Sequence, residues 1–155
     1  MDELRVPKHK TDVEVLLPGG AVRRMAIFLA EAASDHAGPE VPLDLLNGRD
    51  DFIPALDAAA GAMTFLHRPG VPVVRVARGL DPGEEDVTLP TEHEVEVQLV
   101  DGTTLAGLVS YVRPADRTRL VDVLNEPHPF FRLLQGDQVA YVNKRHVSCV
   151  ALRAR

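Results

Sequence analysis

The chain is poor in several residue types on which other protein classes depend. Among its 155 residues there is no tryptophan and only one cysteine, and aromatic residues make up 5%. The single cysteine, Cys149, excludes the intrachain disulfide framework of small secreted domains. Because aromatic side chains are scarce, aliphatic residues must fill most of the core. Hydrophobic residues make up 45% of the chain, which is enough for a packed core.

Long apolar runs are also missing. No run approaches the roughly 20 residues that a membrane-spanning helix needs. The first ten residues are rich in charge and contain no apolar signal core. We therefore expect a soluble, cytoplasmic protein that makes no membrane contact.

The charge balance is acidic. Lys and Arg number 17 against 23 Asp and Glu, a net charge of −6, which disfavours a broad nucleic-acid surface. Much of the excess lies in residues 78–92, which hold one basic and five acidic residues together with proline and glycine. This composition predicts an acidic linker that does not fold alone. Residues 1–11 are expected to form a flexible arm.

The strongest pattern is an internal repeat. Residues 13–20 (Val-Glu-Val-Leu-Leu-Pro-Gly-Gly) align with residues 95–102 (Val-Glu-Val-Gln-Leu-Val-Asp-Gly). Further matches follow in the same order: Leu43–Asn47 with Val121–Asn125, Phe52 with Phe130, Leu56 with Leu134, and Met63–Arg68 with Val139–Lys144. Four matches in register indicate two diverged repeats, over residues 12–77 and 93–153, on either side of the linker.

Each repeat is expected to be mostly β with one short helix. Val95, Val97 and Leu99 alternate with polar residues, which is typical of a strand with one buried face. A hairpin turn at Asp101-Gly102 and a bend at Gly107 should follow. The spacing of apolar residues predicts a helix over 118–125, and three further strands complete a β-β-α-β-β-β order. Asn47 and Asn125 are expected to end the helices in a left-handed conformation.

The second repeat resembles the Sm-like small β-barrel. The matching motifs are Val95–Gly102 followed by Gly107-Leu-Val109, and the paired apolar strands of Val139–Val150 around a short polar turn. The pattern is also similar to small bacterial domains of unknown function that carry an Asp-x-Leu-Asn helix and a Val-Asn-Lys-x-His turn. The resemblance implies two tandem small barrels that form a pseudo-dimer.

The resemblance also bears on partners. Sm-like barrels often form rings by pairing their edges, so a homo-oligomer is one option. Pro69 and Pro72, with the acidic linker, are expected to block such pairing in the first repeat, because prolines blunt strand edges. The family's RNA-binding loop often reads Arg-Gly-Asn or Arg-Gly-Asp, and neither His67–Gly70 nor Asn143–His146 reproduces it.

The most site-like cluster is the turn Asn143, Lys144, Arg145 and His146. Two cations, an amide and an imidazole on one tight turn suit a phosphate or carboxylate. The alternative is a polar turn that binds nothing, with Asn143 there for its turn geometry. The first repeat keeps only His67 and Arg68 at the matching place, so a site there would be asymmetric.

No pattern of catalysis or metal binding stands out. The six histidines lack metal-ligand spacing, and no cysteine pair joins them. Asp44 and Asp122 occupy matching positions, where local backbone bonding is favoured over a catalytic pair. We therefore expect no enzyme activity, cofactor or metal.

Two functions of different classes follow. The first is a protein-interaction or scaffolding module, in which open strand edges dock a partner's strand. The second is an RNA-binding Sm-like protein that uses Lys144 and Arg145 with Arg113, Arg117 and Arg119. The net charge of −6 opposes the second. A small-ligand sensor or an enzyme is the remaining alternative.

Overall fold

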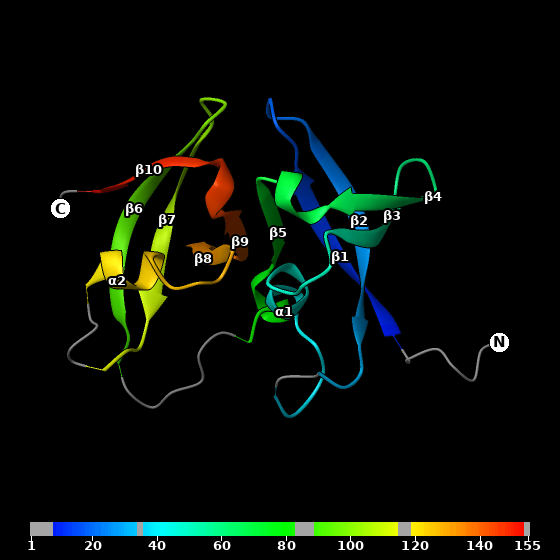
Figure 1. Ribbon diagram of the computed structural model, residues 1–155, viewed down its shortest axis with the longest axis horizontal. Coiled ribbons are helices and arrows are strands. Elements are labelled where there is room, and N and C mark those ends of the chain that lie inside the picture. Colours follow the sequence, from blue (N-terminus) through cyan, green and yellow to red (C-terminus); the bar gives the residue numbers. More distant parts are fainter. Residues whose placement is uncertain (1–7, 34–35, 83–88, 115–118, 154–155) are drawn as a thin grey trace.

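The computed structural model describes residues 8–33, 36–82, 89–114 and 119–153 (Figure 1). The centre of the expected linker, Arg117 and the expected helix start at Thr118 lie outside these residues. Within them, no helix has the length and hydropathy to cross a membrane.

Within the described residues, ten antiparallel strands form one open sheet, accompanied by two short α-helices and three single-turn 3-10 helices, which are labelled η. The strand order is β10-β6-β7-β8-β9-β5-β1-β2-β3-β4. The elements along the chain are β1 (Lys8–Leu16), β2 (Val22–Ala30), α1 (Pro42–Leu46), β3 (Phe52–Asp57), β4 (Ala62–His67), η2 (Arg68–Gly70), β5 (Val73–Ala77), η3 (Arg78–Leu80), β6 (Thr91–Leu99), β7 (Thr104–Tyr111), α2 (Leu120–Leu124), β8 (Phe130–Gln135), β9 (Gln138–Asn143), η5 (Lys144–His146) and β10 (Val147–Leu152).

The mostly-β class and the β-β-α-β-β-β order of each repeat are confirmed. The register repeats as well. Phe52 lies opposite His67 in the first repeat, and Phe130 lies opposite Asn143 in the second. The first strand starts at Lys8, so the expected flexible arm over residues 1–11 extends too far into the chain. Its partner β2 continues the pairing as far as Lys8, which gives this end of the strand a full ladder.

Alternation explains the strands of the second repeat. Val95, Val97 and Leu99 are 0%, 0% and 1% exposed, whereas the residues between them face solvent. Gly107 sits where β7 passes very close to β8, because a Cβ there would lie 2.5 Å from the carbonyl oxygen of Leu134. The predicted bend is therefore a close backbone approach that only glycine permits.

Pro42 and Asp44 stabilise the start of α1, and an asparagine ends each of the two helices. Pro42 occupies the first turn of α1, where its missing N–H costs nothing, and the Asp44 carboxylate accepts a hydrogen bond from the Val41 N–H at 3.0 Å. The expected local role of Asp44 is thus confirmed. The predicted left-handed conformation at the helix ends is wrong, because Asn47 and Asn125 have φ of −91° and −88°. Each instead ends its helix by donating its own N–H to carbonyls of the preceding turn.

The repeats join side by side through β5 and β9. Val73 lies opposite Val142, and Val74 lies opposite Tyr141. Of the two hydrophobic clusters, the one in the first repeat also contains second-repeat side chains, namely Phe130, Leu134, Val139 and Tyr141. The cluster of the second repeat contains Leu16 and Val73 from the first. The two cores are therefore built in common across this junction.

The junction corrects the expectation that each repeat is a closed barrel. The described residues form one open sheet and contain no closed barrel, because β5, which would have to pair with β4 to close the first repeat, pairs with β9. The block that Pro69 and Pro72 are expected to place on ring formation between chains stays a prediction, but within the chain they do not prevent β5 from pairing with β9. Pro72 contributes its carbonyl oxygen, which accepts the Asn143 N–H at 2.8 Å, so its missing donor is not needed.

Candidate functional site

The predicted polar turn lies at the junction between the repeats. Asn143 is 1% exposed, and its side-chain amide donates to the carbonyl oxygens of Pro69 at 3.1 Å and Val71 at 3.0 Å. Its amide oxygen accepts the Arg145 N–H at 3.0 Å and so caps η5. The His146 ring lies 3.0 Å from the Pro69 oxygen. Asn143 and His146 thus fasten the second repeat to the η2 turn of the first.

The cations of the turn behave differently from one another. The Lys144 ammonium donates to the carbonyl oxygen of Glu126, and burial lowers the pKa of Lys144 while the Glu126 carboxylate opposes that shift. The side chain of Arg145 is exposed. An anion at this turn would therefore meet mainly Arg145, because Asn143 and Lys144 already donate to backbone oxygens.

The two first-repeat residues of the predicted cluster differ in exposure: Arg68 is buried and His67 is exposed. Arg68 is 9% exposed, its Nε donates to the Asp50 carbonyl oxygen at 2.8 Å, and its guanidinium lies 3.8 Å from the Asp51 carboxylate. His67 is exposed and its ring centroid lies 4.9 Å from that of Phe52. The structure thus brings the two predicted turns together, but Arg68 serves the local backbone. Ligand binding at this cluster stays a prediction.

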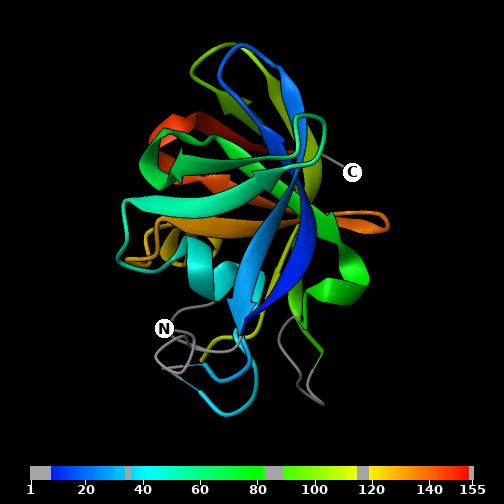
Figure 2. The same ribbon diagram turned by 90° about the vertical axis from the view of Figure 1, so that its right-hand side faces the viewer.

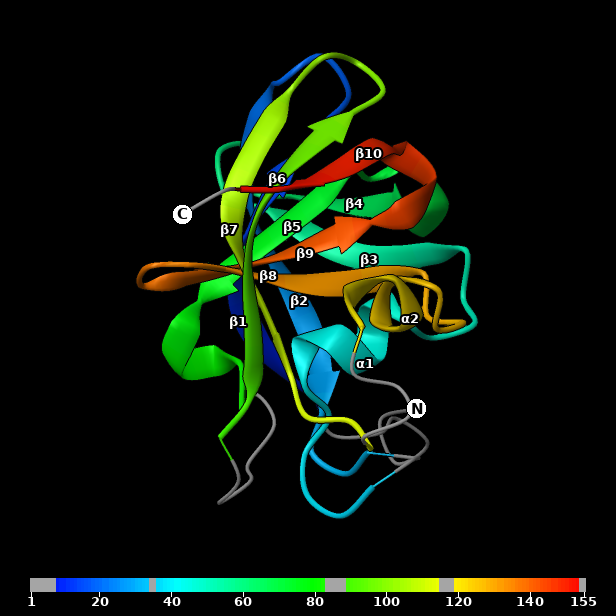
Figure 3. The same ribbon diagram turned by 90° about the vertical axis from the view of Figure 1, so that its left-hand side faces the viewer.

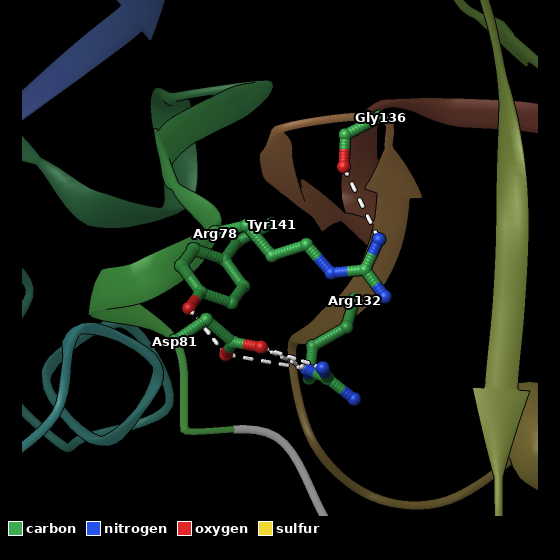
Figure 4. Close-up of polar contacts among 5 residues, drawn as sticks. All are labelled: Arg78, Asp81, Arg132, Gly136 and Tyr141. Atoms are coloured by element: carbon green, nitrogen blue, oxygen red, sulfur yellow. Dashed lines mark hydrogen bonds and ion pairs between the residues drawn. The ribbon is translucent and has the colours of Figure 1, made fainter.

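A second polar cluster at the junction was missed by the sequence analysis (Figure 4). Asp81 follows η3, in the segment expected to be a solvated linker, yet its side chain is only 5% exposed. Arg132 of β8 donates to both Asp81 oxygens at 2.5–3.2 Å, and the Tyr141 hydroxyl donates to Asp81 at 2.6 Å. Burial and this carboxylate raise the pKa of Tyr141.

The cluster anchors the start of the linker to the second repeat. Arg78 adds to it, because its guanidinium donates to the Gly136 carbonyl oxygen at 3.2 Å and its N–H to that of Asp137 at 2.8 Å. No sequence signal marks Asp81, since an aspartate beside proline and glycine is typical of solvated turns. The charges of Asp81 and Arg132 cancel, and the Tyr141 hydroxyl is held protonated, so the cluster is suited to holding the repeats together.

A pocket of about 370 Å³ opens between the two helices. Most of its charged lining is paired, and Lys144, which also lines the pocket, donates to the Glu126 carbonyl oxygen. Arg113 donates to both oxygens of Glu126 at 2.8 Å, which lowers the pKa of Glu126, and Arg132 binds Asp81. Asp44 lies 2.6 Å from the His36 ring. These pairs neutralise most of the charge that lines the pocket, and Lys144 and His128 are the basic residues that remain outside them. The described residues also contain no group of three side chains placed to hold a metal ion.

The most distinctive surface is apolar and belongs to the first repeat. Phe52, Met63 and Phe65 are 59%, 52% and 66% exposed. They share one face of the β3–β4 hairpin, because Met63 and Phe65 are two residues apart on β4 and Phe52 lies opposite His67 on that face. We call these three residues the β3–β4 face. Figure 2 turns this side of the molecule toward the viewer.

The matching residues of the second repeat have the opposite exposure. Phe130, Val139 and Tyr141 occupy the positions of Phe52, Met63 and Phe65, and they are 2%, 0% and 0% exposed. They are buried because the first repeat covers them at the β5–β9 junction. The β3–β4 face is therefore the same kind of surface without its cover. The sequence alignment of the repeats identifies these apolar positions, but it does not show that they are exposed in the first repeat and buried in the second.

No protein-family model, curated protein or solved structure matches the chain. Its function is therefore inferred from its own geometry.

Proposed function

We propose that this protein is a non-catalytic protein-interaction module that docks a protein partner on the β3–β4 face and along the neighbouring free edge of β4. The observation that carries the proposal is the exposure of Phe52, Met63 and Phe65, at 52% or more each. Contiguous exposed apolar side chains of this size are typical of interaction surfaces. Aromatic residues and methionine are also enriched in the cores of protein interfaces.

The edge of β4 supports the same proposal. β4 is the last strand of the sheet, so the backbone groups on its outer side have no strand partner there. Natural proteins usually protect such an edge with charged residues or proline. The β4 sequence, Ala-Met-Thr-Phe-Leu-His, contains no lysine, acid or proline. An added strand would gain main-chain hydrogen bonds from this edge and side-chain contacts from the β3–β4 face.

We also propose that the two repeats are related to Sm-like small barrels. The support for this relationship is the Val95–Gly102 motif together with the shared β-β-α-β-β-β order. Protein docking at an open strand edge does not require the repeats to be closed barrels. The polar turn carries less weight for RNA binding, because Asn143 and Lys144 donate to backbone oxygens.

Photo-crosslinking in cells tests the proposal. A benzophenone amino acid replaces Phe65 in one variant and Leu89 in a matched control, since Leu89 is 92% exposed but lies outside the β3–β4 face. We expect the variant at position 65 to give discrete crosslinked protein bands that the control lacks. Adding Met63→Glu to the variant at position 65 should remove the bands. Identical band patterns at both positions would refute docking on this face.

A further inference from the structure

The junction inside the chain is a template for a junction between chains. It joins the fifth strand of the first repeat, β5, to the fourth strand of the second repeat, β9. The two strands left at the ends of the sheet are the fourth strand of the first repeat, β4, and the fifth strand of the second, β10. The free edges are thus the repeat equivalents of the two strands that already pair.

Both free edges carry the side chains that such a junction needs. On the β4 side, Met63 and Phe65 match Val139 and Tyr141, which are fully buried at the internal junction. On the β10 side, Leu152 is 64% exposed and matches Val76, which is 2% exposed. Figure 3 shows β10 at the front of the second repeat, and Figure 1 shows β10 and β4 on opposite sides of the molecule. One chain therefore has little means of joining its own two edges.

We propose that the partner docked at the β3–β4 face is a second copy of this chain, whose β10 pairs antiparallel with β4. This rests on the proposed function and names the partner. The internal register, in which Val73 lies opposite Val142, predicts the new one. On one face Val150 of one chain meets Phe65 of the second and Leu152 meets Met63; on the other, Cys149 meets Leu66 and Ala151 meets Thr64.

The composition of the two edges favours this pairing. None of the eight facing residues is charged, so the contact brings no like charges together even though each chain carries −6. The contact joins two different surfaces, so it is heterologous, and repeated use of it closes a ring or extends a filament. In a closed ring every chain buries its β3–β4 face, and in a filament every chain but one terminal chain does.

The contact between chains is weaker than the internal junction, because it lacks the ion pair and the buried hydrogen bonds of Asp81, Tyr141 and Asn143. Pro54 stands where Arg132 stands in the second repeat, and Phe65 where Tyr141 stands, so no ion pair with a counterpart of Asp81 forms. His67 replaces the buried Asn143. Assembly is therefore expected to be reversible and to depend on protein concentration.

Disulfide crosslinking between β10 of one chain and β4 of another tests the predicted register. At the internal junction the Asn143 N–H binds the Pro72 oxygen, so the next pair along, Val73 and Val142, is a non-hydrogen-bonded pair. Cα atoms in such a pair lie about 4.5 Å apart, within the range of a disulfide. The matching pair between chains is Cys149 and Leu66. Cys149 is the only cysteine and is exposed, so Leu66→Cys supplies the one missing thiol.

We expect mild oxidation of purified Leu66→Cys protein to give covalent dimers and larger multiples of 16.9 kDa. Adding Cys149→Ser should abolish these products. Ala62→Cys is the register control, because it lies four residues from Leu66 on the same side of β4 and leaves the β3–β4 face intact, so it should crosslink far less. Equal crosslinking of Leu66→Cys and Ala62→Cys, or of Leu66→Cys with and without Cys149→Ser, would overturn the proposed register.

Sedimentation of the unmodified protein separates the two proposals and does not depend on the folding of a cysteine variant. We expect concentration-dependent assembly that Phe65→Glu reduces to a single chain of 16.9 kDa. Single chains at every concentration would overturn self-docking. In that case, a different protein crosslinked in cells at position 65 would still support the interaction module, whereas the absence of any crosslink would remove both proposals.

Discussion

Removing Asp81 should destabilise the whole chain far more than its position in an acidic linker would indicate. The Asp81 side chain is 5% exposed and that of Arg132 is 19% exposed, with their closest atoms 2.5 Å apart. Asp81→Ala would leave the Arg132 guanidinium largely buried without its counter-charge and the Tyr141 hydroxyl without its acceptor. Breaking one side of a buried ion pair costs about 3–5 kcal/mol.

Urea unfolding followed by far-UV circular dichroism measures this loss. For a slope of about 2 kcal/mol per molar urea, the midpoint should fall by about 1.5–2.5 M. The double variant Asp81→Ala/Arg132→Met should be more stable than Asp81→Ala alone, because it removes the uncompensated charge and keeps an apolar side chain of similar length.

Two results would refute this reasoning. A midpoint shift for Asp81→Ala below about 0.5 M would correspond to roughly 1 kcal/mol, the value of an exposed pair, and would mean that Asp81 is solvated. A double variant whose loss equals the sum of the single losses would mean that Asp81 and Arg132 do not interact. Glu92→Ala provides the matched control, because Glu92 is an exposed acid at the other end of the same linker.

Three further predictions concern residues of the junction and the core. Gly107→Ala should destabilise the chain by about 1–3 kcal/mol in urea unfolding, because the added Cβ would lie 2.5 Å from a β8 carbonyl oxygen; an unchanged midpoint would contradict the close approach. Asn143→Ala should cost about 1–3 kcal/mol, since buried η2 carbonyl oxygens lose their donor, and a loss within about 0.5 kcal/mol would mean that the amide does not join the repeats. The chain has two tyrosines and no tryptophan, and burial raises the pKa of both Tyr111 and Tyr141 above 10.0, so phenolate absorbance at pH 10 should stay well below half-ionisation. The stabilisation linked to these raised pKa values is complete below pH 10 and lost as the pH rises further. The phenolate of Tyr141 should therefore appear together with unfolding, and half-ionised tyrosine in folded protein at pH 10 would contradict this.

Much of the local structure could be predicted from residue patterns. The repeat, the order of its elements and the buried alternation at Val95, Val97 and Leu99 all follow from side-chain periodicity, which is a local property of the chain. The helix ends were predicted with the wrong conformation. Asparagine tolerates a left-handed backbone, but here Asn47 stays at negative φ and its side-chain oxygen accepts the Phe130 N–H at 2.9 Å, a contact with the other repeat.

The candidate sites were harder to predict, because they depend on contacts between distant segments. The cluster of Asn143, Lys144, Arg145 and His146 was recognised as polar, but Asn143 and His146 are directed at carbonyl oxygens in or just after the η2 turn, 72 or more residues earlier. Asp81 was assigned to a solvated linker, because nothing near it in the chain signals Arg132 or Tyr141. The exposure of Phe65 was equally hidden, since its equivalent Tyr141 has the same pattern of neighbours and is buried.

The sequence by itself determined the two repeats, their strands and helices, and the lack of any recognisable catalytic motif, since these depend on composition and short-range periodicity. Only the tertiary structure decided that β5 pairs with β9, and hence which apolar faces are covered. Two repeats in one chain form one internal junction, which leaves one fourth strand and one fifth strand unpaired. The same aligned residues are therefore core in one repeat and surface in the other, because burial depends on what lies across the sheet edge rather than on the strand itself.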